Sequence, residues 1–502
     1  MDYETISTNE KTNYRTLLNL RGALFSTTTI ILICWYLNFL WRRRKLYISS
    51  WSTPGPLAFP FVGNLYLFHG GIEALLGMFS KLAMTYPDLF RMWMGPHLVY
   101  YISKPEFIQR ILCNNLDKAN WVYEYMSYIA GDGLLVLPLN SWKKHKKAIM
   151  PSFGQQTLNS FVETFNDKAE ILFDQLQKHV GKMDTDLHEK LFSFNVDIVC
   201  ETLMGVEVNL QTTASELGKK LNRIFEIANI KIFSMWYHID IFWKLSPLCR
   251  EADYLKNLVK TNFVLSVSTT IFDKISRCRE NSGRADGTQP TQDEFKMKLP
   301  FLDCMIYKSD LTQNEIEDEV HTFMGAVSFF IILQEKVYKE VMEICGPNRR
   351  ISPSDLNKLK YTERVIKETL RIFPSVPLMV RNIDTELKLG AHTLPKGASA
   401  IFSIRFIHMD PKYWPDPYKF DPDRFLPENM DKRHSCSYIP FSYGPRNCIG
   451  GRFAMMVLLT TLANLIRKFR FFSGYKTIEE IDVIPTVVIK LKYGNKVRLE
   501  LR

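Results

Sequence analysis

The chain has few cysteines for its length, and no two of them stand close together. There are nine in 502 residues, and none belongs to a Cys-x-x-Cys motif. An odd number of scattered cysteines argues against a disulfide framework and against a cysteine-ligated zinc site. We therefore expect the bulk of the chain to occupy a reducing compartment. The nine are Cys34, Cys113, Cys200, Cys249, Cys278, Cys304, Cys345, Cys436 and Cys448.

The sequence also lacks the motifs of nucleotide and nucleic-acid binding. It has no phosphate-binding loop, and Gly131-Asp132-Gly133 lacks the third glycine of a dinucleotide-binding fingerprint. No helix-turn-helix or zinc-finger spacing is present, so we expect no nucleic-acid partner. Lys and Arg outnumber Asp and Glu by 64 to 53, a net charge of +11. That surplus would suit an anionic membrane face or an acidic protein partner.

The composition is that of a packed protein. Hydrophobic residues make up 46% of the chain and charged residues 23%. These values exclude a disordered, collagen-like or disulfide-scaffold chain. At about 150 residues per domain the length allows three domains, although single-core enzymes of this size are common.

An uncharged, mostly apolar segment of about nineteen residues runs from Ala23 to Trp41. At about 1.5 Å of helical rise per residue, it roughly matches the hydrocarbon core of a bilayer. The basic run 42–45 follows directly, so the positive-inside rule places the rest of the chain in the cytosol. The alternative is a cleaved signal peptide, but no small-x-small cleavage site is present. We expect a membrane anchor over residues 1–45, a basic and proline-rich linker over 46–56, and a folded domain over 57–502.

The body of the chain is predicted to be mainly helical. Residues 141–275 predict amphipathic helices with few breakers. Residues 88–103 alternate in polarity around Gly95-Pro96 and predict a small β-hairpin. The final run, TVVIKLKYGNKVRLEL, predicts two strands joined as a hairpin at Gly494-Asn495.

The strongest chemical signal is the run FSYGPRNCIGG, which begins at Phe441 and precedes a long helical pattern. Cys448 would lie at the start of that helix, where the helix dipole and free N–H groups favour a thiolate, and a thiolate suits iron. Gly444 and Gly450 would let the backbone and a large planar ligand approach closely. Arg446 would neutralise a carboxylate on that ligand, and Phe441 would cover the sulfur. The competing interpretation is a glycine-rich turn with an inert cysteine.

This run resembles, at every fixed position, the Phe-x-x-Gly-x-Arg-x-Cys-x-Gly haem-thiolate signature of the cytochrome P450 monooxygenases. The resemblance extends over nearly the whole chain. The tracts AGDGLLVL and DIVCETLMGVEVN look most like the microsomal fatty-acid omega-hydroxylase branch and its insect relatives. The resemblance implies a mainly α fold with small β-sheets, and haem b (heme b) whose iron is bound by the Cys448 thiolate.

The resemblance also implies an activity and partners. The protein would insert one oxygen atom from dioxygen into a lipophilic molecule, such as a fatty acid, a steroid hormone or a xenobiotic. It would take electrons from a flavoprotein NADPH-cytochrome reductase, with cytochrome b5 as a further candidate partner. Its location would be the endoplasmic reticulum membrane, with the catalytic domain in the cytosol.

Three further residues resemble the family's contacts to the haem propionates. Trp142 and Lys146, in SWKKHKKAIM, match a tryptophan and a basic residue on one helix. The family usually has arginine at the second position, and lysine keeps the charge but gives up the bidentate fork. Arg381 matches another propionate-binding arginine. The alternative for both basic residues is a solvated surface charge.

A second set resembles the family's scaffold around the thiolate loop. Glu368 and Arg371 stand three apart on one predicted helix face, a spacing that alone indicates an ordinary surface pair. By resemblance they join Arg424 and tie down the loop that carries the cysteine. Asp423 stands where the family more often has glutamate, and we expect this one-methylene change to matter little.

The resemblance fails over the predicted central helix, residues 312–333. The capping box Thr312-x-x-Glu315 starts it well. The family's acid-threonine pair, which helps deliver protons to oxygen, has no match before the chain continues into the next helical pattern. Roughly fifteen residues are absent, about 22 Å of helix. We therefore identify no catalytic proton-delivery residue.

Nearby residues are weak substitutes for the missing pair. Gly325-Ala326 would stand for the family's small pair, and Ser328 is the nearby hydroxyl. His321 and Thr322 lie a turn or more upstream and also fit ordinary helix positions. The shortening indicates either an altered transcript or gene model, which we favour, or a divergent protein with a short central helix.

Two other functions compete with the monooxygenase. The first is a protein that binds haem but is catalytically impaired, or a chain that fails to fold, because the acid-threonine pair is missing. The second is a membrane adaptor without a cofactor, which would leave the cysteine loop without a purpose. The sequence names no substrate, because no polar anchor stands out among the predicted pocket segments.

Overall fold

The computed structural model describes residues 3–59, 62–182, 185–213, 215–259, 334–494 and 496–502. Between residues 301 and 319 it also describes the ten positions 301, 302, 305, 309, 311, 312, 315, 316, 318 and 319. The helices expected over 260–275 and the central segment 321–333 lie outside the described residues.

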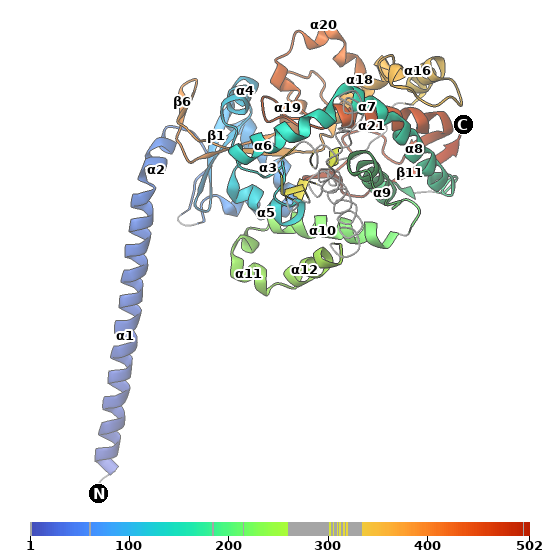
Figure 1. Cartoon of the computed structure of the whole chain (residues 1–502). Helices are drawn as coiled ribbons and strands as arrows, with labels where there is room; N and C mark the ends of the chain where they lie inside the picture. Colours follow the sequence, from blue (N-terminus) through green and yellow to red (C-terminus); the bar gives the residue numbers. More distant parts are fainter. Residues whose placement is uncertain are drawn as a thin grey trace, which may run out of the picture.

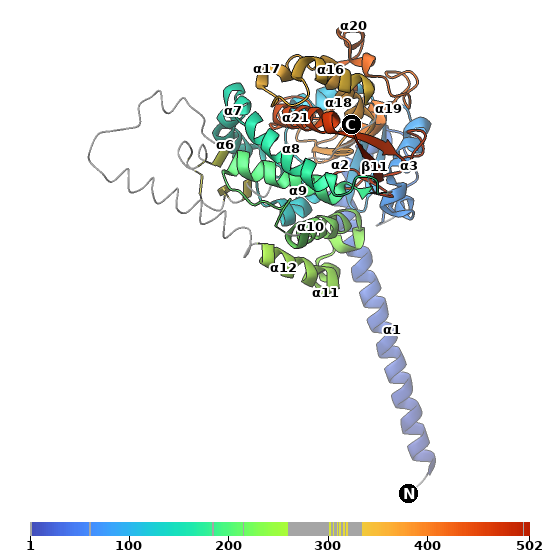
Figure 2. The same ribbon diagram turned by 90° about the vertical axis from the view of Figure 1, so that its right-hand side faces the viewer.

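The N-terminal apolar segment forms one long helix, α1 (Tyr3–Arg42), which projects away from the body of the protein (Figures 1 and 2). Its part Arg21–Arg42 is long and apolar enough to cross a membrane. Threonines within it satisfy their hydroxyls on the helix itself: Thr27 donates to the carbonyl of Ala23 at 2.7 Å. This local bonding explains how an apolar helix accommodates three consecutive threonines.

A short helix, α2 (Arg44–Trp51), joins α1 to the body. Tyr47 stacks on Trp93 with ring centroids 4.2 Å apart, and Arg43 donates to the carbonyl of Pro96. The extended chain begins only after this helix. The first half of the segment expected as a linker is therefore helical and packs on the body.

A four-stranded sheet forms one side of the body, in the order β1-β2-β7-β4. Strands β1 (Leu89–Met94) and β2 (His97–Ile102) are antiparallel and turn at Gly95, which confirms the hairpin expected there. β2 pairs in parallel with β7 (Ser399–Ser403), which pairs in turn with β4 (Leu378–Asn382). β4 matters for the site because it carries Arg381.

The C-terminal hairpin expected at Gly494-Asn495 is wrong. Strand β10 (Lys490–Leu491) pairs with β9 (Val483–Ile484), whereas β11 (Lys496–Leu501) pairs with β8 (Phe469–Ser473) and β3 (Thr185–Asp186). Pairing with β8 buries Leu499 beside two phenylalanines of that strand. This distant pairing buries more apolar surface than a local hairpin of two short polar strands would. The remaining small sheet is β5 (Leu387–Leu389) with β6 (His392–Leu394).

Helices make up most of the described body, which confirms the mainly α fold with small β-sheets. The helices beyond α2 are α3 (Gly71–Thr85), α4 (Pro105–Asn114), α5 (Asn120–Ala130), α6 (Leu139–Ile149), α7 (Gln155–Ser160), α8 (Val162–Gln177), α9 (His188–Val199), α10 (Ser215–Phe233), α11 (Asp240–Leu245), α12 (Pro247–Val259), α16 (Glu335–Cys345), α17 (Pro353–Leu356), α18 (Lys360–Ile372), α19 (Ile404–Met409), α20 (Pro427–Met430) and α21 (Gly451–Lys468).

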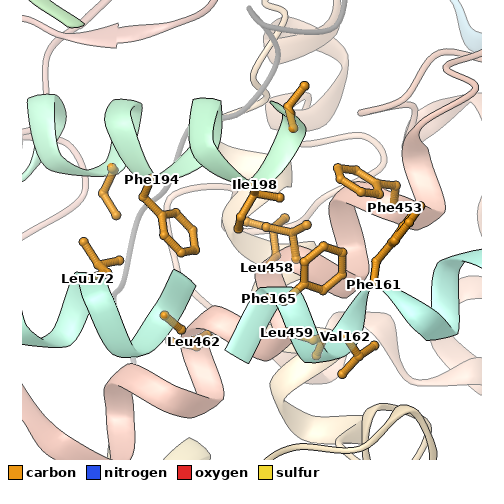
Figure 3. Close-up of a cluster of buried hydrophobic side chains, with 14 of the residues drawn as sticks. Phe161, Val162, Phe165, Leu172, Phe194, Ile198, Phe453, Leu458, Leu459 and Leu462 are labelled. Carbon is orange, nitrogen blue, oxygen red and sulfur yellow. The ribbon is translucent and has the colours of Figure 1, made fainter. Parts of the chain in front are cut away.

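The principal core lies between α8, α9 and α21 (Figure 3). Phe165 of α8 meets Phe453 of α21 edge to face, with ring centroids 5.5 Å apart. Phe194 and Ile198 of α9 point into the same cluster. Because α21 begins directly after the cysteine motif, this core fixes the position of Cys448.

Candidate functional site

A cavity of about 610 Å³ lies inside the helical body. Most of the described residues that line it are apolar, and α5, α9, α10, β4 and α21 are among the elements that contribute them. The loop 440–450 forms part of its wall, and Cys448 lies in that loop. The motif cysteine thus borders a space of the size that holds ligands in proteins.

Backbone hydrogen bonds fold the loop around the cysteine. The N–H of Cys448 donates to the carbonyl of Phe441 at 2.9 Å, and the N–H of Asn447 donates to that of Gly444 at 3.2 Å. Gly444 has a φ of +78°, and a Cβ there would lie 2.6 Å from the carbonyl oxygen of Leu112. Gly444 therefore lets the loop pack against α4. It is not among the residues that line the described cavity, and its contact with a bound ligand stays a prediction.

Gly450 and Phe441 both border the cavity, and Gly450 also lies beside the sulfur. A Cβ on Gly450 would lie 4.0 Å from Cys448 Sγ and 3.9 Å from the ring of Phe153. The ring of Phe441 packs on Gly451, where a Cβ would lie 3.3 Å from it. A larger residue at position 450 would occupy the space next to the sulfur.

Opposing effects act on the Cys448 thiol. Burial raises its pKa, whereas the backbone N–H of Gly450 at the start of α21 and the ammonium of Lys118 lower it. Burial is the largest effect, so the helix start alone does not produce the expected thiolate. A thiol that coordinates a metal ion is deprotonated outright, because the metal supplies the compensating charge.

Four cationic side chains line the cavity, and three of them, Lys118, Arg381 and Arg446, form a group in which Lys118 interacts with both arginines and with Cys448. Within the described part of the chain, neither Lys118 nor Arg381 has an ion-pair partner, and Arg446 reaches Asp117 only at 4.0 Å. Burial, followed by the nearby Arg381 and Arg446, holds the pKa of Lys118 well below its usual value. Enclosed cations with so little compensating charge favour an anionic ligand.

One of the three side-chain nitrogens of Arg446, Nε, makes no hydrogen bond in the described part of the chain. Its side chain donates to the carbonyl of Leu116 at 2.7 Å and to that of Leu137. Its guanidinium lies 5.1 Å from the ring centroid of Trp142. Burial, and next Arg381, lower the pKa of Arg446 to about 10. Its buried Nε has no hydrogen-bond partner in the described part of the chain, so it is positioned to bind a ligand.

Trp142 and Lys146 of α6 differ in their relation to the cavity. Trp142 is buried and lines it, whereas Lys146 does not border its described wall. Lys146 Nζ instead donates to the carbonyl of Pro445 at 2.6 Å and lies 4.9 Å from the Trp142 ring centroid. The expected contact of Lys146 with the ligand is thus replaced by a contact that holds the cysteine loop. Arginine, with its planar guanidinium, could bind this carbonyl and a second acceptor at the same time. The single ammonium of lysine is less suited to such a two-pronged contact.

The three residues expected as a scaffold meet behind the cysteine loop. Arg371 of α18 donates to both carboxylate oxygens of Glu368, at 2.6 and 2.8 Å, and both side chains are fully buried. Arg424 Nε lies 3.6 Å from the same carboxylate. Burial raises the pKa of Glu368, and Arg371 opposes that effect. The spacing of three residues is therefore a buried network here rather than a surface pair.

The network extends toward the cysteine through His408. Arg371 donates to the carbonyl of His408 at 2.9 Å and to that of Pro417 at 2.7 Å. His408 Nε2 in turn accepts the N–H of Ile439 at 2.8 Å. Ile439 lies two residues before Phe441, so α18 is linked to the start of the cysteine loop.

The start of the central segment is described, although its middle is not. Thr312 N–H donates to Glu315 Oε2 at 2.7 Å, and Glu315 N–H donates to Thr312 Oγ1 at 3.3 Å, which confirms the capping box. The candidate substitutes in the range 321–328 lie outside the described residues.

Comparison with known proteins identifies the family. The family model for cytochrome P450 matches residues 53–328 and 332–497. The chain belongs to the cytochrome P450 family. Membership makes it a haem-thiolate monooxygenase, a protein whose haem iron is ligated by a cysteine thiolate.

Known relatives cover almost the whole chain. Cytochrome P450 4c21 of Blattella germanica is 33% identical, over 93% of this chain and 97% of that protein. Cytochrome P450 4g1 of Drosophila melanogaster is 32% identical, over 95% and 94%. Cytochrome P450 4V2 of Mus musculus is 32% identical, over 89% of each. These relatives confirm the expected branch, with its insect members.

The site of this cytochrome P450 fits a haem. Haem b carries two carboxylates on an otherwise apolar ring, and the cavity offers apolar walls and a group of cations beside Cys448. The buried Arg446 Nε without a partner is the clearest sign of a missing acceptor. The cysteine ligand, the hydrogen-bond donors and the positive charge of the site therefore suit haem, the cofactor of the family.

Sequence reasoning missed Lys118. It stands alone in the tract LDKANW, and no spacing connects it with Arg381 or Arg446. Its ammonium donates to the carbonyl of Leu135 and lies 4.6 Å from the ring centroid of Tyr123. Only the fold brings these residues to one cavity.

Proposed function

We propose that this cytochrome P450 binds haem b through the thiolate of Cys448 and inserts one oxygen atom from dioxygen into a lipophilic small molecule. The observation that carries the proposal is the meeting of Cys448 with Lys118, Arg381 and Arg446 at one large apolar cavity. A fatty acid, a steroid hormone or a xenobiotic would fit the apolar lining. The comparisons support the reaction class and leave the substrate open.

Each residue at the cavity has a defined task in this proposal. Arg381, Arg446 and Lys118 would bind the two haem carboxylates, because they lack full compensation within the described chain. Phe441 would keep water from the Cys448 sulfur, and Lys146 would position the loop through Pro445. When bound, the haem iron supplies the activation of dioxygen.

The scaffold would keep the cysteine loop in place during the reaction. Glu368, Arg371 and Arg424 are held together inside the protein, and His408 connects them to Ile439. A buried network with this many bonds is rigid, because moving one member leaves polar groups unpaired. The geometry of the sulfur would therefore not depend on surface fluctuations.

We further propose that α1 anchors the protein in the endoplasmic reticulum membrane, with the catalytic domain in the cytosol. Support comes from the apolar length of Arg21–Arg42 and from the basic run 42–45 at its end. A flavoprotein NADPH-cytochrome reductase would supply electrons, and cytochrome b5 would be a second donor. An acidic docking surface on such a partner would suit the net charge of +11.

One observation favours a second candidate, a protein that binds haem but is catalytically impaired. The family match is interrupted between residues 328 and 332, where the acid-threonine pair is missing from the sequence. Without these groups, protons would reach oxygen poorly, and reducing equivalents would be lost as peroxide.

The first test is the absorption spectrum of the reduced protein with carbon monoxide. A strongly red-shifted Soret band requires a cysteine thiolate on haem iron, and we expect it in the wild type. Cys448→Ser should lose the band, and Cys249→Ser, on α12, should keep it. A band that survives Cys448→Ser would contradict the ligand assignment.

A second measurement separates the two candidate functions. NADPH consumption, product and peroxide are measured together with a reductase and a lipophilic substrate. Tight coupling of electrons to product supports the monooxygenase. Peroxide without product, in a protein with a normal carbon monoxide spectrum, supports the impaired variant.

A further inference from the structure

A second polar group borders the cavity, separate from the cations beside Cys448. It consists of Asp186, His188, Asn222 and Lys490, which come from β3, α9, α10 and β10. The charges that act on His188 are those of Lys490, Asp186 and Glu189.

His188 presents an unsatisfied nitrogen in this group. It is the first residue of α9, and its backbone N–H donates to Asp186 Oδ1 at 3.0 Å. Its Nε2 is buried and makes no hydrogen bond of normal geometry within the described part of the chain, although the side chain of Asn222 lies close enough to interact with the ring. A buried polar atom of this kind on a cavity wall marks a place where a ligand atom can bind.

The imidazole is uncharged near neutral pH. Burial is the largest cause that lowers the pKa of His188, and Lys490 adds to it. Asp186, Asn222 and Glu189 oppose the shift without reversing it. A neutral imidazole can donate or accept one hydrogen bond at Nε2, according to its tautomer.

The charges around His188 do not favour an anion. Lys490 Nζ is paired with Glu226 Oε1 at 3.4 Å. Asp186 is one of the residues that border the cavity, and Glu189 is the next residue after His188. A ligand carboxylate here would meet Asp186 and compete with Glu226 for Lys490.

We propose that His188 and Asn222 bind an uncharged polar end of the substrate, such as a hydroxyl, carbonyl, ester or amide. The apolar remainder of the molecule would lie along the cavity wall toward Cys448. The inference rests on the proposed function, since it concerns the substrate of the same cavity. The inference predicts that the cavity binds long-chain alcohols and related neutral lipids more tightly than free fatty acids.

The test compares three probes of equal chain length on the full-length holoprotein: decan-1-ol, decane and decanoate. Binding is measured by calorimetry, which does not depend on turnover. Decan-1-ol should bind about five- to tenfold more tightly than decane, the effect of one neutral hydrogen bond. It should also bind more tightly than decanoate. Equal binding of decan-1-ol and decane, or tighter binding of decanoate, would overturn the proposal.

Variants assign the preference to His188. His188→Leu should remove the advantage of decan-1-ol over decane, and His188→Gln, which keeps a hydrogen-bonding side chain, should retain most of it. Lys492→Met is the matched control, because Lys492 is close in sequence to Lys490 but pairs with Glu73 at 2.8 Å. An unchanged advantage in His188→Leu would contradict the proposal, as would its loss in the control.

The carbon monoxide spectrum separates this inference from the proposed function. A normal spectrum with no preference for decan-1-ol contradicts the inference alone. A protein without the haem-thiolate band contradicts the proposed function, and the calorimetric preference still decides the role of His188.

Discussion

His145 and Glu319 meet inside the protein, with Nδ1 of the histidine 2.7 Å from Oε1 of the carboxylate. The other oxygen of Glu319 accepts the N–H of Leu134 at 3.0 Å. His145 belongs to α6, which also carries Trp142, whereas Glu319 belongs to the start of the central segment. This contact connects the start of the central segment to α6, which carries the cavity residue Trp142.

Glu319→Ala should destabilise the protein by about 3 kcal/mol, because it removes the partner of His145 Nδ1 and of the Leu134 N–H in the interior, and leaves His145 only the longer contact of Nε2 with Glu315. Glu163→Ala is the control, since Glu163 is 81% exposed and should change stability by less than about 0.5 kcal/mol. Chemical denaturation measures both. Equal effects would show that the buried contact contributes nothing.

Arg371→Met should cost about 3 to 5 kcal/mol, because it removes the two short hydrogen bonds to the buried Glu368 carboxylate and leaves it only the more distant Arg424 as a charged partner. The cysteine loop should loosen with it, so the carbon monoxide spectrum should lose its thiolate band. Arg350→Met is the comparison, since that arginine is half-exposed and pairs with Asp167 at 2.7 Å. It should cost at most about 1 kcal/mol. An intact band in Arg371→Met would contradict the scaffold role.

Lys118→Met should weaken haem retention. The loss of one charge-assisted hydrogen bond should speed haem dissociation about 10- to 100-fold. Transfer of haem to an excess of apomyoglobin measures the rate. Lys104→Met should leave it unchanged, because Lys104 pairs with Asp88 outside the cavity, at 3.4 Å. Unchanged dissociation in Lys118→Met would remove Lys118 from the cofactor site.

Gly444→Ala should be more harmful than Gly346→Ala. Both glycines have positive φ, +78° and +69°, so each alanine would be forced into an unfavourable backbone conformation at a cost of about 1 to 3 kcal/mol. At Gly444 the new Cβ would also lie 2.6 Å from Leu112 oxygen, whereas nothing lies within 4 Å at Gly346. Thermal unfolding compares them. Equal effects would show that the loop can move away from α4.

Stability should fall with acid partly through His408. Burial, and next Arg371, lower its pKa from 6.5 to about 3. Between these values the unfolded state binds more protons than the folded state, so stability is complete above pH 6.5 and decreases as the pH falls toward 3. One such group contributes at most about 1.4 kcal/mol per pH unit.

His408→Gln should reduce that slope, because the variant has no group that titrates in this range and its amide oxygen can reach the position of Nε2 and still accept the N–H of Ile439. Denaturation at several pH values measures the slope. Equal slopes in wild type and variant would exclude His408 as a source of the acid sensitivity.

Local signals in the sequence determined much of this protein. The apolar run 23–41 predicted a helix because its length and lack of charge allow little else. The motif around Cys448 predicted the cysteine loop and the helix that follows. Its glycines and its helical pattern are local signals that depend on neighbouring residues only. The alternation around Gly95 predicted its hairpin for the same reason.

Tertiary structure decided what depends on distant partners. The C-terminal strands did not pair across Gly494, because burial of Leu499 against β8 outweighs a local turn. Lys146 contacts Pro445 rather than the cavity, and Lys118 reaches the cavity without any motif. The burial of a side chain and its charge partners depend on which distant segments meet in the fold. A local sequence pattern therefore cannot predict them. The shape of the cavity and the position of His188 on its wall follow from the same cause.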